Sequence, residues 1–533
     1  METIKEKLIN VGYHSDLSRT KLDAFSDTYS SSFLANQYMN RNSAGWKTAK
    51  FIILKDFGQI NASEQDAVIK NWKNFSAVYK NQYLILQKDG FFEVLDFSGE
   101  IVANQDSFDE FINQNKPYEE LIKTKKKKLY DLDKSKISYS QYLLAIRTKP
   151  FLLLAGISGT GKSRIVKQMA FESCPDVEEL RRDKTSPGNY QLIEVKPNWH
   201  DSTEVLGYES EIGGKHYVTT PFVKFLVKAM CYPDVPFFVC MDEMNLAPVE
   251  QYFAEFLSVL ESRKLLDDSK TITSESLIDA DIFASKDYEL KLQDELLGLE
   301  LKEESEADGD VRIISGKLSE EKQKIYDKLK VEGLRIPSNL IVVGTVNMDE
   351  TTHQFSRKVI DRAMTIEMNI EDSEDPFNKF FTESKDLEYS PSPLAKELFL
   401  PTVVQAKEAL VNLSEGGDAD YLEKEVPAKL YSLNQALNGT PFKIAYRVQN
   451  ELVLYFHELR KEQPKSTAEE LLKQALDAIL MLKVLPRIEG DEDLLEKPLE
   501  KLHKFTEDYA EARKKVEEMQ ARLKGGHFTS FWP

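Results

Sequence analysis

Cysteine is scarce in this chain, with only Cys174, Cys231 and Cys240 among its 533 residues. Their spacing matches no metal-binding pattern, and three cysteines cannot form the even set of a disulfide framework. Two of them fall in or beside apolar runs, as buried free thiols do. We therefore expect a protein of a reducing compartment that has neither structural disulfides nor a cysteine-based metal site.

Positive charge is also in short supply, since 70 lysine and arginine residues face 89 acidic ones and give a formal net charge of −19. A chain with this balance does not suit general coating of nucleic acid, so any contact with DNA must be local or made by a partner. No run approaches about 18 uncharged apolar residues, and residues 1–5 lack the apolar core of a signal peptide. The sequence predicts a soluble cytoplasmic protein without a membrane partner.

The strongest pattern is at residues 156–163, which match the phosphate loop G-x-x-x-x-G-K-[ST] at every fixed position. An apolar strand is expected before the loop, at 151–155, and an amphipathic helix after it. Glycines let successive backbone N–H groups face phosphates, the lysine adds a positive charge, and the serine hydroxyl reaches Mg²⁺. The motif predicts a nucleoside triphosphatase that binds ATP or GTP with Mg²⁺. The expected binding residues are Gly156, Ile157, Ser158, Gly159, Thr160, Gly161, Lys162, Ser163 and Arg164.

Two further polar groups come directly after apolar strands. Asp242 and Glu243 follow the predicted strand at 236–241, and Asn347 follows the one at 339–346. Because the carboxyl ends of parallel strands meet at one edge of a sheet, these side chains are expected beside the phosphate loop. We expect Asp242 to hold the metal together with Ser163, Glu243 to polarise the attacking water, and Asn347 to orient that water.

The length of the chain predicts two to four domains. Residues 1–115 contain strand-like runs at 50–54, 83–87 and 91–97, the last two joined by Lys-Asp-Gly, which is a hairpin signal. Helical patterns accompany them, so a small α+β recognition or adaptor domain is expected. Residues 116–137 are predicted to be a basic linker, with contact to a phosphate backbone as the alternative.

From 138 to 370 the pattern is typical of an α/β core, a mostly parallel sheet flanked by helices. A charged segment at about 265–333 interrupts it, and we expect most of that segment to face solvent. Residues 371–533 are expected to form an all-α lid and a tail. A hairpin is expected at 207–217, which either caps the sheet or faces a partner. The predicted strands of the core are 151–155, 191–196, 236–241, 340–346 and 363–368.

Taken together, these motifs resemble the McrB-like branch of the AAA+ ATPases, within the larger group that also holds MoxR and dynein. The resemblance covers about 150–370 strongly and 370–533 moderately. Besides the phosphate loop, it rests on residues 198–208, 242–245, 344–362, 446–448 and 528–532. It implies an AAA+ core whose subunits form a ring, expected to be a hexamer, with nucleotide bound between subunits.

The resemblance also implies roles for three arginines. Arg362 looks like the finger that a subunit inserts toward its neighbour's γ-phosphate, and Arg357 is the second candidate. Arg447, in the helical region, looks like a second sensor that couples the lid to the nucleotide state.

The chain departs from the family in its Met-Asn-x-x-Asp signature. Here the acid at the third place after Asn347 is Glu350, with Asp349 beside it. Glu350 is therefore a further catalytic candidate, and which of the two acids positions water or metal stays open. The departure also weakens any inference of a GTP preference.

Two functions remain open. The first is the motor of a McrBC-like restriction or antiviral defence system. No PD-(D/E)xK or HNH nuclease set is present, so a separately encoded McrC-like subunit would cut the DNA. DNA would be recognised by the N-terminal domain or by the partner. Aromatic residues that could stack on a flipped base, although a core role is favoured, are Phe33, Tyr38, Trp46, Phe51, Trp72, Tyr79 and Tyr83. The second function is a MoxR-like chaperone that remodels proteins.

Overall fold

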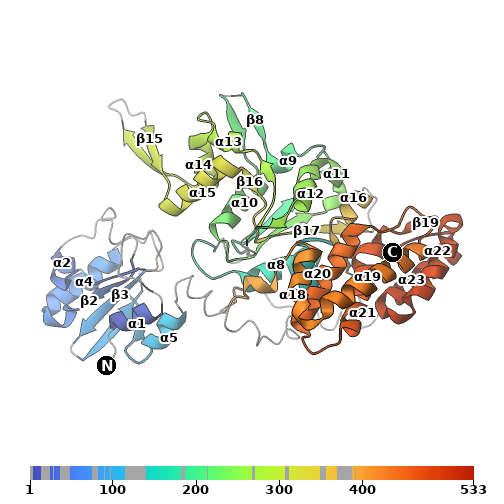
Figure 1. Ribbon diagram of the computed structural model, residues 1–533. Helices are drawn as coiled ribbons and strands as arrows, with labels where there is room; N and C mark the ends of the chain where they lie inside the picture. The colour runs from blue at the N-terminus through green and yellow to red at the C-terminus, as the bar shows by residue number, and fades with distance from the viewer. Residues whose placement is uncertain are drawn as a thin grey trace. The chain divides into compact units, whose positions relative to one another are not determined.

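The chain forms two compact units, Met1–Asp131 and Leu132–Pro533, which are described separately. Figure 1 shows the computed structural model as a ribbon. The predicted linker at 116–137 lies outside the described residues. The structure describes residues 4–11, 13, 24–27, 29–36, 49–74, 82–88, 90–96, 98–114, 140–181, 186–212, 214–266, 271–305, 311–348, 356–368, 387–390 and 392–532.

The N-terminal unit is a five-stranded mixed sheet in the order β1-β2-β3-β4-β5. The first three strands are parallel and the last two pair antiparallel, with β3 and β4 forming the predicted hairpin. Alternate residues along each strand point to opposite faces. The elements are α1 (Ile4–Asn10), β1 (Ala24–Ser26), α2 (Ser31–Asn36), β2 (Ala49–Leu54), α4 (Ala62–Asn74), β3 (Tyr83–Lys88), β4 (Phe91–Leu95), β5 (Ile101–Asn104) and α5 (Phe108–Gln114).

Both faces of this sheet are covered by helices. Phe51 packs in one apolar cluster with residues of α1 and α5. Trp72 belongs to a second cluster, which joins α2 and α4 to the other face. Both side chains are buried, which confirms the core role for these two aromatic residues, whereas Phe33 is exposed. Tyr38, Trp46 and Tyr79 lie outside the described residues.

The second unit is built on a parallel five-stranded sheet in the order β18-β6-β17-β10-β7. It confirms the α/β class and all five predicted strands. The strands are β6 (Phe151–Gly156), β7 (Tyr190–Glu194), β10 (Phe237–Asp242), β17 (Leu340–Asn347) and β18 (Met364–Glu367). The helices around them are α7 (Ser140–Thr148), α8 (Lys162–Ser173), α9 (Thr203–Leu206), α10 (Pro221–Cys231), α11 (Val249–Tyr252), α12 (Ala254–Glu261) and α16 (Arg357–Ile360).

The strand order places the three predicted motifs at one edge of this sheet. Strand β6 lies between β18 and β17, and β17 in turn lies beside β10. In register, Asn347 at the end of β17 is opposite Gly156 at the end of β6. Ligands of open parallel sheets bind outside the carboxyl ends of the strands, at the point where the strand order reverses. Here that point is the carboxyl end of β6.

The segment at 265–333 is more compact than the sequence suggested. Helices α13 (Ala280–Ala284), α14 (Glu289–Leu297) and α15 (Glu320–Glu332) bury Phe283, Leu292 and Tyr326, and the Tyr326 hydroxyl donates to the carbonyl of Phe283 at 3.0 Å. Charged outer faces had concealed these inward apolar positions. The strands of the segment are β11 (Lys264–Leu265), β12 (Ile272–Thr273), β13 (Ser276–Ile278), β14 (Glu300–Ser305) and β15 (Val311–Lys317), with β16 (Leu334–Arg335) after it.

The hairpin predicted at 207–217 is present as β8 (Tyr208–Ser210) and β9 (His216–Val218). The Tyr288 hydroxyl donates to Glu209 at 2.7 Å, so the hairpin is tied to the start of α14. Tyr217 is buried and Tyr208 is half exposed.

The C-terminal region is helical, as expected. Figure 1 shows its helices at the opposite end of the unit from the β14–β15 hairpin. The predicted tail, however, ends in strand β20, which pairs antiparallel with β19. Among the described residues, no helix has the length and apolar character needed to cross a bilayer. The elements are α18 (Ala406–Leu413), α19 (Asp418–Ala436), α20 (Tyr446–Glu462), α21 (Ala468–Ile479), η7 (Leu480–Val484), η8 (Leu485–Arg487), β19 (Glu489–Asp491), α22 (Glu492–Phe505), α23 (Ala510–Gly526) and β20 (Phe528–Ser530).

A buried ion pair joins these helices to the sheet. Arg147, at the end of α7, donates to Glu458 of α20 at 2.8 Å and also pairs with Glu462. Burial would raise the pKa of Glu458, but the hydrogen bond from His457 and the charges of Lys461 and Arg147 outweigh it and lower that pKa to about 2. Because α7 directly precedes β6, the contact fixes α20 against the strand that leads to the phosphate loop.

Candidate active site

The phosphate loop connects strand β6 to helix α8. Gly159 and Gly161 have φ angles of 83° and 82°, in the left-handed region that favours glycine. Gly156 is constrained by space instead, because a Cβ atom there would lie 2.1 Å from the carbonyl oxygen of Met368. The glycines of the motif are therefore required by the backbone path of the loop.

Lys162 is the first residue of α8, and its ammonium group lies within the loop. The side chain is only 6% exposed, and Nζ donates to the carbonyls of Ile157 at 2.7 Å and Gly156 at 3.1 Å. Gly161 at the N-cap has no side chain that could cap the first N–H groups of α8. A helix N-terminus beside a lysine ammonium suits an anion such as phosphate. Ile157, Ser158 and Arg164 are exposed.

Ser163 and Asp242 are joined by a hydrogen bond of 2.7 Å between the hydroxyl and Oδ1 of the carboxylate. The pair places the last residue of the loop against the end of β10. Among the described residues, no group of three or more His, Cys, Asp or Glu side chains could hold a metal ion. One carboxylate and one hydroxyl nevertheless suit Mg²⁺, which completes its coordination with water and substrate phosphates.

Glu243 and Asn347 also meet at this edge. Asn347 Nδ2 donates to Glu243 Oε1 at 3.2 Å, across the ends of β10 and β17. Glu243 has a φ angle of 51°, a left-handed conformation that costs a non-glycine residue about 1–2 kcal/mol. Residues held in such conformations cluster at functional sites. From this turn the Glu243 carboxylate reaches the Asn347 side chain at the end of the neighbouring strand.

Thr345 completes the arrangement, and the sequence analysis did not identify it. Its hydroxyl donates to Asp242 Oδ1 at 2.7 Å and accepts the backbone N–H of Glu243 at 3.1 Å. One buried hydroxyl therefore fixes the Asp242 carboxylate and the strained turn at Glu243 together. The only signal in the sequence is a polar residue within an otherwise apolar strand.

Replacing Thr345 with valine should lower both stability and hydrolysis. The substitution keeps the shape but leaves the Glu243 N–H without its partner, which costs about 1–3 kcal/mol for a buried polar group. The matched control is Thr365→Val on β18, because the buried Thr365 hydroxyl has no hydrogen-bond partner in the described part of the chain. Thermal unfolding should show a lower midpoint for Thr345→Val and an unchanged or higher one for Thr365→Val. Equal unfolding midpoints for Thr345→Val and Thr365→Val would contradict the bridging role of Thr345.

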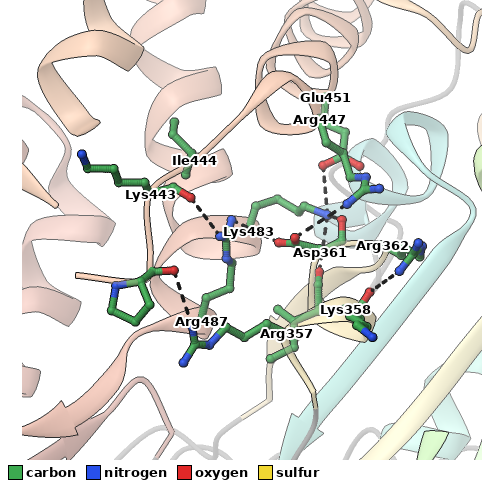
Figure 2. Close-up of polar contacts among 12 residues, drawn as sticks. Arg357, Lys358, Asp361, Arg362, Lys443, Ile444, Arg447, Glu451, Lys483 and Arg487 are labelled. Atoms are coloured by element: carbon green, nitrogen blue, oxygen red, sulfur yellow. Dashed lines mark hydrogen bonds and ion pairs between the residues drawn. The ribbon is translucent and has the colours of Figure 1, made fainter. Parts of the chain in front are cut away.

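The three predicted arginines lie together, around the short helix α16 (Figure 2). Arg447 pairs with Glu261 at 2.9 Å and with Asp361 at 3.6 Å. Arg357 lies over the Phe442 ring at 4.9 Å. Arg362 donates to the carbonyl of Lys358 at 3.1 Å, and its Nε is buried without a hydrogen-bond partner among the residues that the structure describes. Within the described part of the chain, the Arg362 guanidinium has no carboxylate partner.

The structure therefore divides the predicted site residues into two groups. The loop, Asp242, Glu243 and Asn347 share one edge of the sheet. Arg362 and Arg447 share the surroundings of Asp361, where acids hold Arg447 and none of the described acids pairs with Arg362. Asp349 and Glu350, the candidates for the signature acid, lie outside the described residues.

Comparison with known proteins gives a match to a family model and matches to solved structures. Residues 401–528, less than half of the chain, match a family described as a domain of unknown function (DUF8727). A crystal structure of a "putative ATPase" from Cytophaga hutchinsonii covers 72% of this chain and 90% of its own, with 12% sequence identity and a TM-score of 0.34. No curated protein matches the chain. Similarity this distant assigns no function to the chain.

Proposed function

We propose that this chain is a Mg²⁺-dependent nucleoside triphosphatase that uses ATP or GTP. The observation that carries the proposal is the convergence of Lys162, the Ser163–Asp242 pair and the Glu243–Asn347 pair at the carboxyl ends of three adjacent strands. A lysine, a metal-binding pair and a water-positioning acid are the parts that phosphoryl transfer to water needs.

Each part has a role that follows from its chemistry. The loop N–H groups and the Lys162 ammonium would hold the phosphates, while Ser163 and Asp242 would bind Mg²⁺, which neutralises developing charge when it is present. The Glu243 carboxylate would accept a proton from the attacking water as general base. Asn347, a neutral amide, would orient that water without competing for the metal.

We further propose that the site is completed by a neighbouring copy of the chain. Arg362 is a half-buried cation without a carboxylate partner among the described residues, and a guanidinium in this setting suits an anion supplied by another chain. A heterologous interface that closes into a ring would bring Arg362 of one subunit to the nucleotide of the next. The family resemblance of the motifs supports a hexamer.

The biological role that we propose is the motor of a McrBC-like restriction or antiviral defence system. The sequence motifs between 150 and 370 support it, and the absence of a nuclease set in the sequence requires a separate McrC-like subunit. The burial of Phe51 and Trp72 argues against these two aromatic residues stacking on a flipped base, and DNA would be recognised by the rest of the N-terminal domain or by the partner. A MoxR-like remodelling role is the alternative, which the acidic net charge favours.

Replacing Lys162 with alanine should weaken nucleotide binding by about 10- to 100-fold, the value of a lost charge-assisted hydrogen bond. Titration of the full chain with fluorescent ATP and GTP analogues, with Mg²⁺, measures the effect. Lys167→Ala on the same helix is the matched control, because Lys167 lies more than one turn beyond the loop. Equal affinities for wild type and Lys162→Ala would overturn the proposed nucleotide site.

The role in restriction needs a separate test. The full chain and the product of a neighbouring gene should together cleave modified or unmodified plasmid DNA when ATP or GTP is present. The Lys162→Ala protein with the same partner should leave that DNA intact. If the wild-type chain hydrolyses nucleotide but no DNA is cut with any partner, the proposed nucleotide hydrolysis stands and the restriction role is excluded.

A further inference from the structure

The backbone turn that carries Arg362 is held by a lysine from the C-terminal helices. Lys483 Nζ donates to the carbonyl oxygens of Asp361 and Ala363, each at 2.7 Å, and lies 3.5 Å from that of Ile360 (Figure 2). Ile360 is the last residue of α16, a helix of only four residues, Asp361 is its C-cap residue, and Ala363 lies two residues further on. A helix end leaves such carbonyls without intrahelical partners, and a cation is the group that they favour. Lys483 therefore caps the turn immediately beside Arg362.

Lys483 stands in an unusual piece of backbone. It belongs to η7, a single π-helical turn between α21 and η8. Such turns are rare within helices and occur frequently at functional sites. The turn lies inside 401–528, the region that matches a domain of unknown function. Lys483, a residue of that region, thus fixes the backbone at Asp361, which lies 122 positions earlier in the chain.

Lys483 is also one member of a closed chain of alternating charges. Glu451 pairs with both Lys483 and Lys149, and Lys149 precedes β6. At the other end of the chain of pairs, the backbone carbonyl of Asp361 accepts a hydrogen bond from Lys483. Burial would raise the pKa of Glu261, but Lys149 and Arg447 outweigh it and lower that pKa. The pairs are Lys483–Glu451 at 2.9 Å, Glu451–Lys149 at 2.9 Å, Lys149–Glu261 at 2.7 Å, Glu261–Arg447 at 2.9 Å, Arg447–Asp361 at 3.6 Å and Asp361–Arg487 at 3.1 Å.

Holding two segments together with a buried lysine costs free energy, because its charge must be removed from water. The Lys483 side chain is only 1% exposed, and burial lowers its pKa to about 8. Apolar residues of similar volume often stabilise a protein as well as a buried ion pair does. What an apolar residue cannot do is bind three carbonyl oxygens and fix the direction of the turn. The arrangement favours a role in geometry over a role in stability alone.

We propose that Lys483 is a positioning residue that sets where Arg362 reaches, so that the C-terminal helices control the completion of a neighbour's site. The inference rests on the proposed function, because it needs Arg362 to act in hydrolysis. Arg362 extends away from the acids around Asp361, whereas Lys483 and Arg447 converge on Asp361 (Figure 2). Lys483 thus holds the backbone of the 361–363 turn, while the Arg362 guanidinium extends from the opposite side of that turn.

The test replaces Lys483 with methionine in the full chain. The control is Arg460→Met, which removes an ion pair to Asp418 at 2.6 Å elsewhere in the same helices. A displacement of about 1 Å at a catalytic group can cost up to 100-fold, so Lys483→Met should lower kcat by about 10- to 100-fold with little change in KM. Hydrogen exchange of the amides at 360–363 should accelerate in Lys483→Met and stay as in wild type in Arg460→Met.

The double variant Arg362→Ala/Lys483→Met separates positioning from general damage. If Lys483 acts through Arg362, the double variant hydrolyses nucleotide no more slowly than Arg362→Ala alone. Multiplied losses, or unchanged exchange at 360–363, would overturn the inference. If Lys483→Met does not fold, Lys483→Gln retains a donor and is judged by the same two measurements.

Failure of the proposed function gives a different result. A wild-type chain that hydrolyses neither ATP nor GTP, or an Arg362→Ala chain with wild-type turnover, overturns both the proposed function and the role of Lys483. Slow turnover in Arg362→Ala with normal turnover in Lys483→Met overturns the role of Lys483 alone.

Discussion

Replacing Glu243 with glutamine should abolish most nucleotide hydrolysis while nucleotide binding persists. A general base contributes about 10²- to 10⁴-fold to a reaction, so kcat should fall by about 10³-fold. The glutamine keeps an oxygen that accepts the hydrogen bond from Asn347, now 3.2 Å, and removes only the ability to take a proton. The Thr345 hydrogen bond to the backbone N–H is unaffected, so the strained turn should survive. Single-turnover hydrolysis and equilibrium binding measure the two effects separately.

The control for this variant is Glu250→Gln, the same chemical change at an exposed position on α11. It should leave hydrolysis within about twofold of wild type, as surface substitutions away from special features usually do. Normal turnover in Glu243→Gln would exclude Glu243 as the base. Loss of binding in the same variant would instead place Glu243 among the groups that hold nucleotide or metal.

The parts of this structure that could be predicted are those fixed by local sequence. An apolar run ending in a glycine-rich loop specifies a strand, a turn and a helix without reference to the rest of the chain. Asp242, Glu243 and Asn347 could be placed at one sheet edge because all three follow apolar strands, and parallel strands end together. The hydrogen bonds at 2.7 and 3.2 Å confirm that these residues meet.

What could not be predicted depends on contacts between distant segments. Strand β20 forms only because residues near 490 lie beside it, and a short run of Phe, Thr and Ser does not reveal that partner. Thr345 has its role because Asp242 and Glu243, at the end of β10, lie beside it on β17. Lys483 is an ordinary lysine in the sequence, and its function as a cap depends on a turn more than one hundred residues away. Tertiary packing decides such roles, and periodicity does not record it.

Replacing Arg362 with alanine should lower hydrolysis by about 10³-fold, because an arginine that stabilises charge in the transition state contributes 10³- to 10⁵-fold. Nucleotide binding should change little, since the guanidinium lies beside α16, where it donates to the carbonyl of Lys358, and contacts no phosphate-loop residue among those described. The control is Lys358→Ala, which removes a cation from the exposed face of α16, the helix just before Arg362. Steady-state turnover at saturating nucleotide compares the two variants.

A mixing experiment decides whether Arg362 acts on its own subunit or on the next. Glu243→Gln and Arg362→Ala are each nearly inactive, but a ring that contains both holds some sites with an intact base from one chain and an intact arginine from its neighbour. At random 1:1 mixing, about a quarter of the interfaces are complete, so turnover should recover to about a quarter of the wild-type rate. An arginine that acts within its own chain gives no recovery, because every site then lacks one of the two groups. Recovery would also require an assembled interface, so the same measurement tests the ring.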